Sequence, residues 1–258
     1  MAMYYGLIDV EMTCDGRKIN GKFVDDGRMK HSQREVISVG FVVVDEKYRI
    51  KAKYSSFVKP VHNPIITSYC QELTGITQKN VDGGKKCNDA FQDIFYLCRK
   101  FDVKHILSFG NCDKMGLSTS VKWIKNKNKK EKVWAICTIA KKIVDVQPAL
   151  LKVIYPKGIK HRPGLKKIAD KLQIIGKKAQ HNALNDTILL ASVCDKAGLV
   201  FTGNEIWQPC DGLRQDADAS VNRRGLHSCE FVDLGSGGRL AENKRPAAEV
   251  VVVPGLVP

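Results

Sequence analysis

Two acidic residues, Asp9 and Glu11, lie near the end of the first stretch of strand-forming residues, within "GLIDVEMTCDG" (Gly6–Gly16). Side chains alternate across a β-strand, so both carboxylates are expected on the same face. Carboxylates held this close repel each other unless a cation lies between them, and hard Mg²⁺ or Mn²⁺ prefers oxygen ligands. The pattern indicates a divalent metal site, with two solvated or salt-bridged acids as the alternative.

A third acid, Asp113 in "SFGNCDK", follows a short apolar stretch that predicts a buried strand. It falls in the first turn of a predicted helix. Open α/β sheets bind ligands beyond the carboxyl ends of their strands, where this residue is expected. The alternative is that Asp113 only complements the dipole of its helix.

His181 and Asp186 in "HNALNDT" open a long amphipathic stretch. On a continuous helix this spacing would separate them by roughly 140°, so they would not share a face. If His181 lies in the loop before the helix, both side chains can reach one site. Histidine exchanges protons near neutral pH, so beside an acidic metal cluster it is suited to be a general base for water. A structural histidine is the alternative.

The three motifs together, in this order and strand context, resemble the DEDDh exonucleases of the DnaQ-like, ribonuclease H-fold superfamily. The resemblance covers Tyr4 to about Gly198. The stretches "DVEMTC", "EVISVGFVVVDE", "FVKPVHNPIITSYCQELTGIT" and "SFGNCDK" are most similar to the branch that trims small and histone-message RNAs and to its bacterial KapD-like relatives. In that branch the first motif tends to continue with Thr-Cys, as Thr13 and Cys14 do, whereas proofreading exonucleases tend to continue with Thr-Thr-Gly.

The resemblance implies a metal-dependent 3′–5′ exoribonuclease that releases nucleoside 5′-monophosphates from the 3′ end of RNA. It implies two Mg²⁺ or Mn²⁺ ions, with His181 as the general base. The implied metal ligands are Asp9, Glu11, Asp113 and Asp186, with Asp9 bridging the two ions. Substrate contacts are expected from Met12 at the terminal base, from Thr13 at the 3′-hydroxyl, and from Asn111.

Two other functions stay open at this point. One is a 3′–5′ DNA exonuclease of the proofreading or repair type. The other is a non-catalytic nucleic-acid-binding protein on the same fold, against which the presence of all the expected acids and the histidine argues.

The chain carries a formal net charge of +15, which favours polyanionic partners. Two Lys-rich segments, 122–132 and 159–178, lie between the motifs. They are expected to contact the backbone of a nucleic acid, with a generally basic, solvated surface as the alternative. The lysines singled out for this role are Lys129, Lys130, Lys166 and Lys167.

The elements that must position these residues alternate between strands and helices. Strands predicted at 4–11, 35–46 and 55–58 follow one another without helices, which indicates an antiparallel meander. Residues 12–34 are expected to form a loop, and "NPIITSYCQELTG" a helix from Asn63 to Gly75. With later strands at 105–110 and around 143, the prediction is an α/β, ribonuclease H-like mixed five-stranded sheet flanked by helices.

Two regions are expected along the chain: an exonuclease domain at 1–200 and a C-terminal extension or tail at 201–258. Within the tail, "EFVDLGSGG" resembles translated cloning-site sequence. A native, loosely folded extension is the alternative. Its "VVVV" before Pro254 is compatible with one edge strand.

The composition also bears on location and redox state. The nine cysteines include no C-x-x-C pair, which favours free thiols over disulfides or zinc. Neither a secretory signal nor an apolar run of the ~20 residues that span a bilayer is present. A cytoplasmic location without membrane contact is therefore expected.

Overall fold

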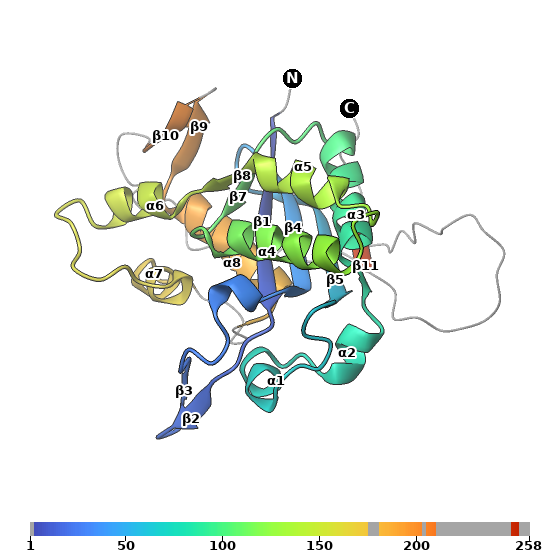
Figure 1. Ribbon diagram of the computed structural model, residues 1–258. Coiled ribbons are helices and arrows are strands. Elements are labelled where there is room, and N and C mark those ends of the chain that lie inside the picture. Colours follow the sequence, from blue (N-terminus) through green and yellow to red (C-terminus); the bar gives the residue numbers. More distant parts are fainter. Residues whose placement is uncertain (1–2, 175–180, 203–204, 210–248, 253–258) are drawn as a thin grey trace.

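The computed structural model describes residues 3–174, 181–202, 205–209 and 249–252 (Figure 1). Its centre is a mixed sheet with the strand order β11-β5-β4-β1-β7-β8, and the short β6 pairs with β5. β4 pairs antiparallel with β1 and β5, whereas β7 runs parallel to β1 and β8. The strands are β1 (Tyr4–Met12), β4 (Val36–Asp45), β5 (Ile50–Lys59), β6 (Lys85–Lys86), β7 (Ile106–Ser108), β8 (Ile143–Asp145) and β11 (Glu249–Val252).

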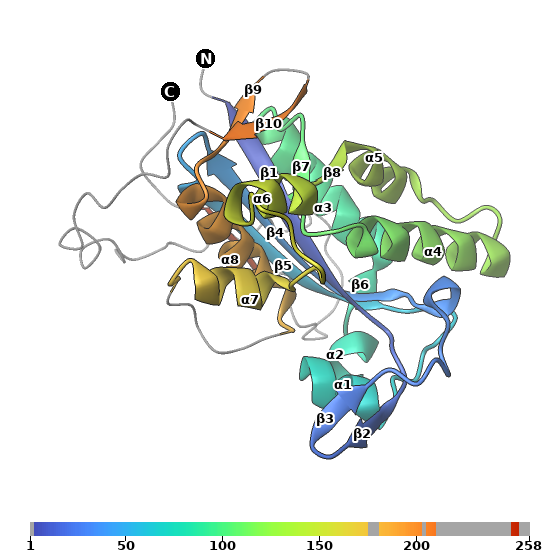
Figure 2. The ribbon, with the colours of Figure 1, turned by 90° about the vertical axis from the view of Figure 1, so that its left-hand side faces the viewer.

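Helices cover both faces of the sheet (Figures 1 and 2). One face carries α3 (Cys87–Lys100), α4 (Cys112–Lys127) and α5 (Trp134–Lys142), and the other carries α6 (Gln147–Ile154), α7 (Leu165–Lys171) and α8 (Ala183–Lys196). In β1, Ile8 and Val10 join the core under α3 and α5, whereas Leu7 joins the core under α8. Every residue of β4 is buried, because both of its faces are covered.

The predicted ribonuclease H-like α/β fold is confirmed. The five strands expected from the sequence correspond to β5, β4, β1, β7 and β8, and β6 and β11 extend the sheet beside β5. β11 lies in the "VVVV" stretch and is the edge strand expected there. β9 (Leu199–Thr202) and β10 (Glu205–Pro209) form a separate pair. Most of the tail, including "EFVDLGSGG", lies outside the described residues, and the domain boundary at 200 stays a prediction.

The segment 12–34 is not the simple loop that was expected. Within it, β2 (Arg17–Ile19) pairs antiparallel with β3 (Lys22–Val24). The turn between them consists of Asn20 and Gly21, with φ of 49° and 75°. Asn-Gly is typical of a two-residue hairpin turn, so the signal was present in the sequence. The short helix η1 (His31–Gln33) follows and contacts α4.

The helix expected from Asn63 to Gly75 starts later than predicted. α1 (Ser68–Thr74) is capped by Thr67, whose Oγ1 accepts a hydrogen bond from Cys70 N (3.0 Å). Asn63 instead donates from its backbone N to Glu35 Oε2 (2.7 Å). The hydrogen bonds of Asn63 hold it against the segment that contains Gln33 and Glu35. Gly75 ends the helix as predicted, with a φ of 70°, and α2 (Gln78–Asp82) follows.

The cysteines in the described part of the chain are free of disulfides, namely Cys14, Cys70, Cys87, Cys98, Cys112, Cys137 and Cys194. Among the described residues, no helix is both long enough and apolar enough to cross a bilayer.

The first turn of α8 lies directly on the backbone of β4 at Gly40. A Cβ atom at Gly40 would lie 2.3 Å from Ala183 C and from Leu184 N. The Thr187 hydroxyl is within hydrogen-bonding distance of Gly40 O (3.2 Å). Gly40 also pairs with Asp9 in the β1–β4 register. The absence of a side chain at Gly40 therefore lets α8 begin beside Asp9.

We expect Gly40→Ala to destabilise the fold by about 3 kcal/mol, the upper end of the range for overpacking, because the added Cβ meets backbone atoms that cannot rotate away. Urea unfolding measures the change. Gly164→Ala is the matched control, because Gly164 has a φ of −71° and nothing lies within 4 Å of its added Cβ. Equal effects of the two substitutions would contradict the assigned role of Gly40.

Candidate active site

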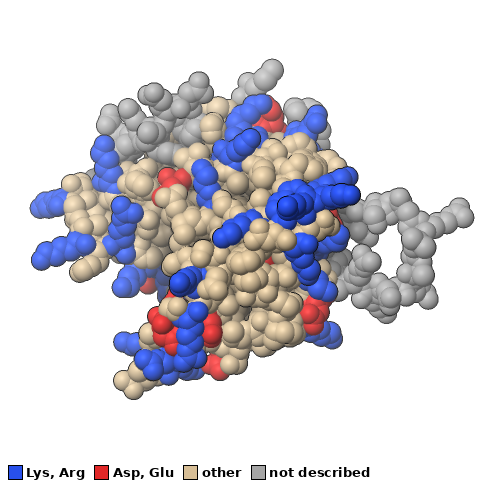
Figure 3. All heavy atoms as spheres, in the orientation of Figure 1, with Lys and Arg blue, Asp and Glu red and all other residues tan. Residues whose placement is uncertain are grey.

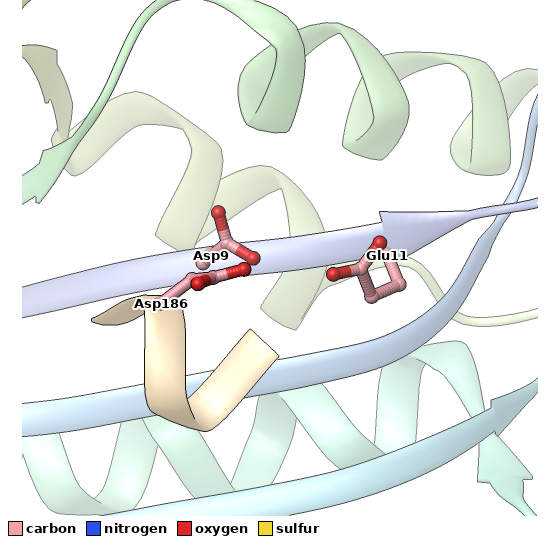
Figure 4. Close-up of side chains that lie close together, drawn as sticks. All are labelled: Asp9, Glu11 and Asp186. Atoms are coloured by element: carbon pink, nitrogen blue, oxygen red, sulfur yellow. The ribbon is translucent and has the colours of Figure 1, made fainter. Parts of the chain in front are cut away.

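Three carboxylates converge where β1 meets the start of α8 (Figure 4). Asp9, Glu11 and Asp186 each offer an oxygen, and these oxygens lie within 4.8 Å of one another. Asp9 and Glu11 project from β1, and Asp186 reaches toward them from the first turn of α8. Leu7, which shares their side of β1, belongs to the core under α8. The strand alternation thus turns both acids toward the helix that supplies the third.

Burial and mutual repulsion make this cluster retain protons. Burial raises the pKa of Glu11 to about 8, and the charge of Asp186 adds to the shift. The pKa of Asp9 also lies well above its usual range. Burial is the larger cause, and repulsion from Asp113 and Glu11 adds to it. The pKa of Asp186 is raised by burial as well, although His181 opposes that shift. A bound cation would favour the charged forms of these groups.

Asp113 lies beside this cluster, at the start of α4. It is buried, and its Oδ1 accepts a hydrogen bond from Val10 N (3.0 Å). The described pairing of β7 with β1 covers Gly6 and Leu7. The following residues of β1, such as Val10, are therefore open to a contact from α4. Burial raises the pKa of Asp113 to about 7 against the opposing effect of backbone N–H donors. The negative charge of Asp113 also raises the pKa of Asp9, so this fourth acid lies close enough to interact with the cluster.

His181 lies in the loop directly before α8, not within the helix. Asn182 caps the helix, and its Oδ1 accepts a hydrogen bond from Asn185 N (3.1 Å). His181 is exposed, and its backbone N donates to Asp186 Oδ2 (3.1 Å). Its φ of 60° is uncommon for a residue other than glycine, and such conformations cluster at active sites. This backbone hydrogen bond holds His181 beside Asp186, one of the clustered acids.

The sequence profile of a family described as Exonuclease, RNase T, matches residues 7–194, which include all four acids and His181. The chain belongs to this exonuclease family. With the four acids and His181 in the expected order, this match confirms the predicted membership in the DEDDh 3′–5′ exonuclease superfamily.

The curated relatives that this chain resembles include several ERI1 exonucleases. The 3′-5′ exonuclease eri1 of Schizosaccharomyces pombe is 31% identical over 38% of this chain and 30% of its own length. ERI1 exoribonuclease 2 of Xenopus laevis is 35% identical over 31% of this chain and 10% of its own. ERI1 exoribonuclease 3 of Homo sapiens is 28% identical over 44% of this chain and 35% of its own. The matches thus span about a third or less of these relatives.

Solved structures share the fold at low sequence identity. The nuclease domain of 3′hExo, a DEDDh family member bound to rAMP, has a TM-score of 0.60 at 19% identity and covers 75% of this chain and 90% of that one. A 3′-exonuclease that recognises the 3′ end of a histone mRNA stem-loop has a TM-score of 0.62 at 17% identity, over 81% and 72% of the two chains.

The residues expected to contact the terminal nucleotide follow Glu11 or precede Asp113 in the chain, and they lie in different environments. Met12 packs against α4, where an added Cβ at Gly116 would lie 2.4 Å from its Sδ. Thr13 is buried, and its Oγ1 accepts a hydrogen bond from Glu35 N (2.9 Å). Asn111 is exposed at the N-terminus of α4. Their contacts with substrate stay predictions.

The two pairs of predicted substrate-binding lysines lie far apart. Lys129 and Lys130 are exposed in the turn after α4, and Lys166 and Lys167 are exposed on α7. Figures 1 and 2 show α7 and the end of α4 on opposite sides of β1. The two pairs therefore do not form one patch, and each would meet a different part of a bound strand.

The donor set fits a divalent cation. Three carboxylate oxygens within 4.8 Å are hard ligands of the kind that Mg²⁺ and Mn²⁺ prefer. Burial first, and repulsion from neighbouring acids second, raises the pKa values of Asp9 and Glu11, and a bound cation would oppose both shifts by favouring the charged carboxylates.

Two residues that position the site were not singled out from the sequence. Gly40 admits the start of α8, and an isolated glycine inside a strand pattern is a signal of close backbone approach. Glu35 is buried, and its backbone N donates to Thr13 directly after the first motif. Nothing in the local pattern around Glu35 distinguished it from an exposed strand-end acid.

We expect the metal-free chain to lose thermal stability as the pH rises from about 5 to about 8.5. The folded carboxyls bind protons more tightly than unfolded ones, whose ordinary pKa is about 4. Their stabilising effect is therefore full below that value and is lost as the pH rises through the folded values of about 7 for Asp113 and about 8 for Glu11. Thermal unfolding in chelator across this range measures the loss.

Added Mn²⁺ is expected to raise Tm more at pH 8 than at pH 5.5, because metal binding displaces protons from these ligands. Asp186→Asn should reduce the Mn²⁺ response at both pH values. A Tm of the unmodified chain that does not respond to Mn²⁺ at pH 8 would refute the metal site.

Proposed function

We propose that the chain is a metal-dependent 3′–5′ exoribonuclease that releases nucleoside 5′-monophosphates from the 3′ end of RNA. The observation that carries the proposal is the convergence of Asp9, Glu11 and Asp186 within 4.8 Å, with His181 joined to Asp186. The exonuclease family membership supports it. We place the enzyme in the cytoplasm as part of the same proposal.

The four acids Asp9, Glu11, Asp113 and Asp186 would hold two Mg²⁺ or Mn²⁺ ions. When bound, such ions stabilise the charge that develops on the attacking and leaving oxygens of a phosphodiester. His181 accepts a proton from the attacking water through an imidazole nitrogen. Its exposed position before α8 lets its ring reach a terminal nucleotide at the cluster.

The preference for RNA rests on the relatives and on one local feature. The curated relatives include ERI1 exoribonucleases 2 and 3. Thr13 and Cys14 follow the first motif, as in the RNA-trimming branch that the sequence resembles. Cys14 is buried with Cys70 in a small core that includes α1, directly after the residues proposed to meet the terminal nucleotide.

We expect 5′-labelled RNA to be shortened one nucleotide at a time with Mg²⁺ or Mn²⁺, and not with chelator. A DNA strand of the same sequence should be degraded more slowly. Gel separation of the labelled strands and chromatography of the released monophosphates measure both. Faster degradation of DNA would make the chain a DNA exonuclease, and binding without turnover at any divalent metal would make it a non-catalytic binder.

His181→Ala is expected to lower kcat by about 10²- to 10⁴-fold, the usual contribution of a general base. Its thermal stability should hardly change, because the side chain is exposed. His31→Ala, which removes another exposed histidine outside the two Lys-rich segments, is the matched control and should retain activity. Undiminished turnover by His181→Ala would disprove the assigned base.

A further inference from the structure

A preformed stack of two aromatic rings lies outside the site. His62 and Trp123 have ring centroids 3.4 Å apart and planes within 5° of parallel. His62 comes from the segment after β5 and Trp123 from α4. Neither ring belongs to the hydrophobic cores formed by the described buried residues. His62 is exposed and Trp123 is half-buried, so the outer face of the stack is the histidine ring.

Both rings are held in place from their surroundings. Trp123 Nε1 donates to Ser32 O (3.3 Å), and Lys122 Nζ lies 5.4 Å from the centre of the Trp123 ring. The backbone N of His62 donates to Glu35 Oε2 (2.7 Å), and Glu35 is only 2% exposed. The flat surface is therefore organised before any ligand arrives, which lowers the entropy lost on binding.

α4 connects this stack with the acidic cluster. Asp113 in its first turn bonds to β1, and Trp123 lies ten residues further along, or about 15 Å at the rise of an α-helix. Met115, which is 47% exposed, Thr119 and Trp123 follow at four-residue intervals and form one stripe along the helix. The stripe leads from the 3′-end site toward the stack.

The surroundings of α4 are basic. The helix contains Lys114, Lys122, Lys125 and Lys127, whereas its acidic residue is the buried Asp113. Figure 3 shows Lys and Arg side chains over α4 and its C-terminal end, whereas Asp and Glu side chains are mixed with Lys and Arg below, over β2 and β3. Phosphates of a strand that follows α4 would meet this positive charge.

We propose that the exposed face of the His62–Trp123 stack binds an unpaired base of the nucleic-acid strand whose 3′ end lies at the acidic cluster. The proposal rests on the proposed function for the direction of the strand. Bases stack on histidine and tryptophan rings, and Lys122 beside the stack suits a phosphate. At 3.4 Å per stacked nucleotide, about 15 Å corresponds to roughly four nucleotides, and to fewer in an extended strand. The stack would thus favour substrates with a single-stranded 3′ end of several nucleotides.

The test measures the binding of fluorescent single-stranded RNA by the full chain with Ca²⁺ in place of Mg²⁺, using a 10-nucleotide strand and a dinucleotide. His62→Ala is expected to raise the Kd for the 10-nucleotide strand by about 5- to 150-fold, the usual loss when one base loses its aromatic partner. His62→Phe keeps a flat ring and should restore binding. Tyr96→Ala removes an aromatic side chain that is 53% exposed on α3, and it is the control expected to bind as the unmodified chain does.

Strands with one abasic position locate the contact. One such position, between the second and the sixth nucleotide from the 3′ end, should weaken binding to the unmodified chain and have no further effect on His62→Ala. Equal loss of affinity for the dinucleotide and the longer strand would mean that the stack only supports the shape of the site. Unchanged Kd for both would also overturn the proposal.

The proposed function is checked separately by hydrolysis of a p-nitrophenyl ester of a nucleoside 5′-phosphate, which is too short to reach the stack. Hydrolysis of this ester by the unmodified chain together with normal RNA binding by His62→Ala would reject only the stacking site. No hydrolysis with any divalent metal, together with length-dependent binding at His62, would reject the catalytic proposal and retain the stacking site.

Discussion

The contact between the start of α8 and the backbone of Gly40 determines where the chemistry of this protein can occur. Gly40 is paired with Asp9, so a helix that begins on Gly40 places its first-turn acid beside Asp9. The same approach sets His181 in the loop just before the helix, with its backbone N bonded to Asp186. A side chain at Gly40 would hold the helix away from the sheet, and the third carboxylate would move away with it.

This arrangement gathers charge that the fold alone does not neutralise. Four acids lie around one end of β1, and burial raises the pKa of each of them. Among them, the Asp113 carboxylate accepts a backbone hydrogen bond from β1 itself. A divalent cation both fits the oxygen donors and removes the repulsion, so stability and metal binding are expected to be linked. In a member of an exonuclease family, a metal bound at this cluster would be available for phosphodiester hydrolysis.

α4 and Glu35 fix the positions of further residues around the four acids. α4 carries Asp113 at one end and Trp123 further along, so the positions of an acid and an aromatic ring are fixed on one rigid element. Glu35 accepts hydrogen bonds from the backbone N atoms of Val61, His62 and Asn63, and its own backbone N donates to Thr13. One buried acid thus fixes both the backbone after the first motif and the segment that carries His62.

The sequence alone predicted the fold class, and it predicted the four acids and the histidine as site residues. The strands and helices were readable from local signals, and the site residues came from the order of three motifs, which resembles the DEDDh exonucleases. It did not reveal the later start of α1, because Asn63 is held by partners such as Glu35 that are distant in sequence. The Asn20–Gly21 hairpin was readable locally and was missed. Only the tertiary structure decided that α8 lies on Gly40, that the two lysine pairs lie on opposite sides of β1, and that His62 stacks on Trp123. Each of these depends on packing between segments far apart in the chain, and no local pattern specifies such distances.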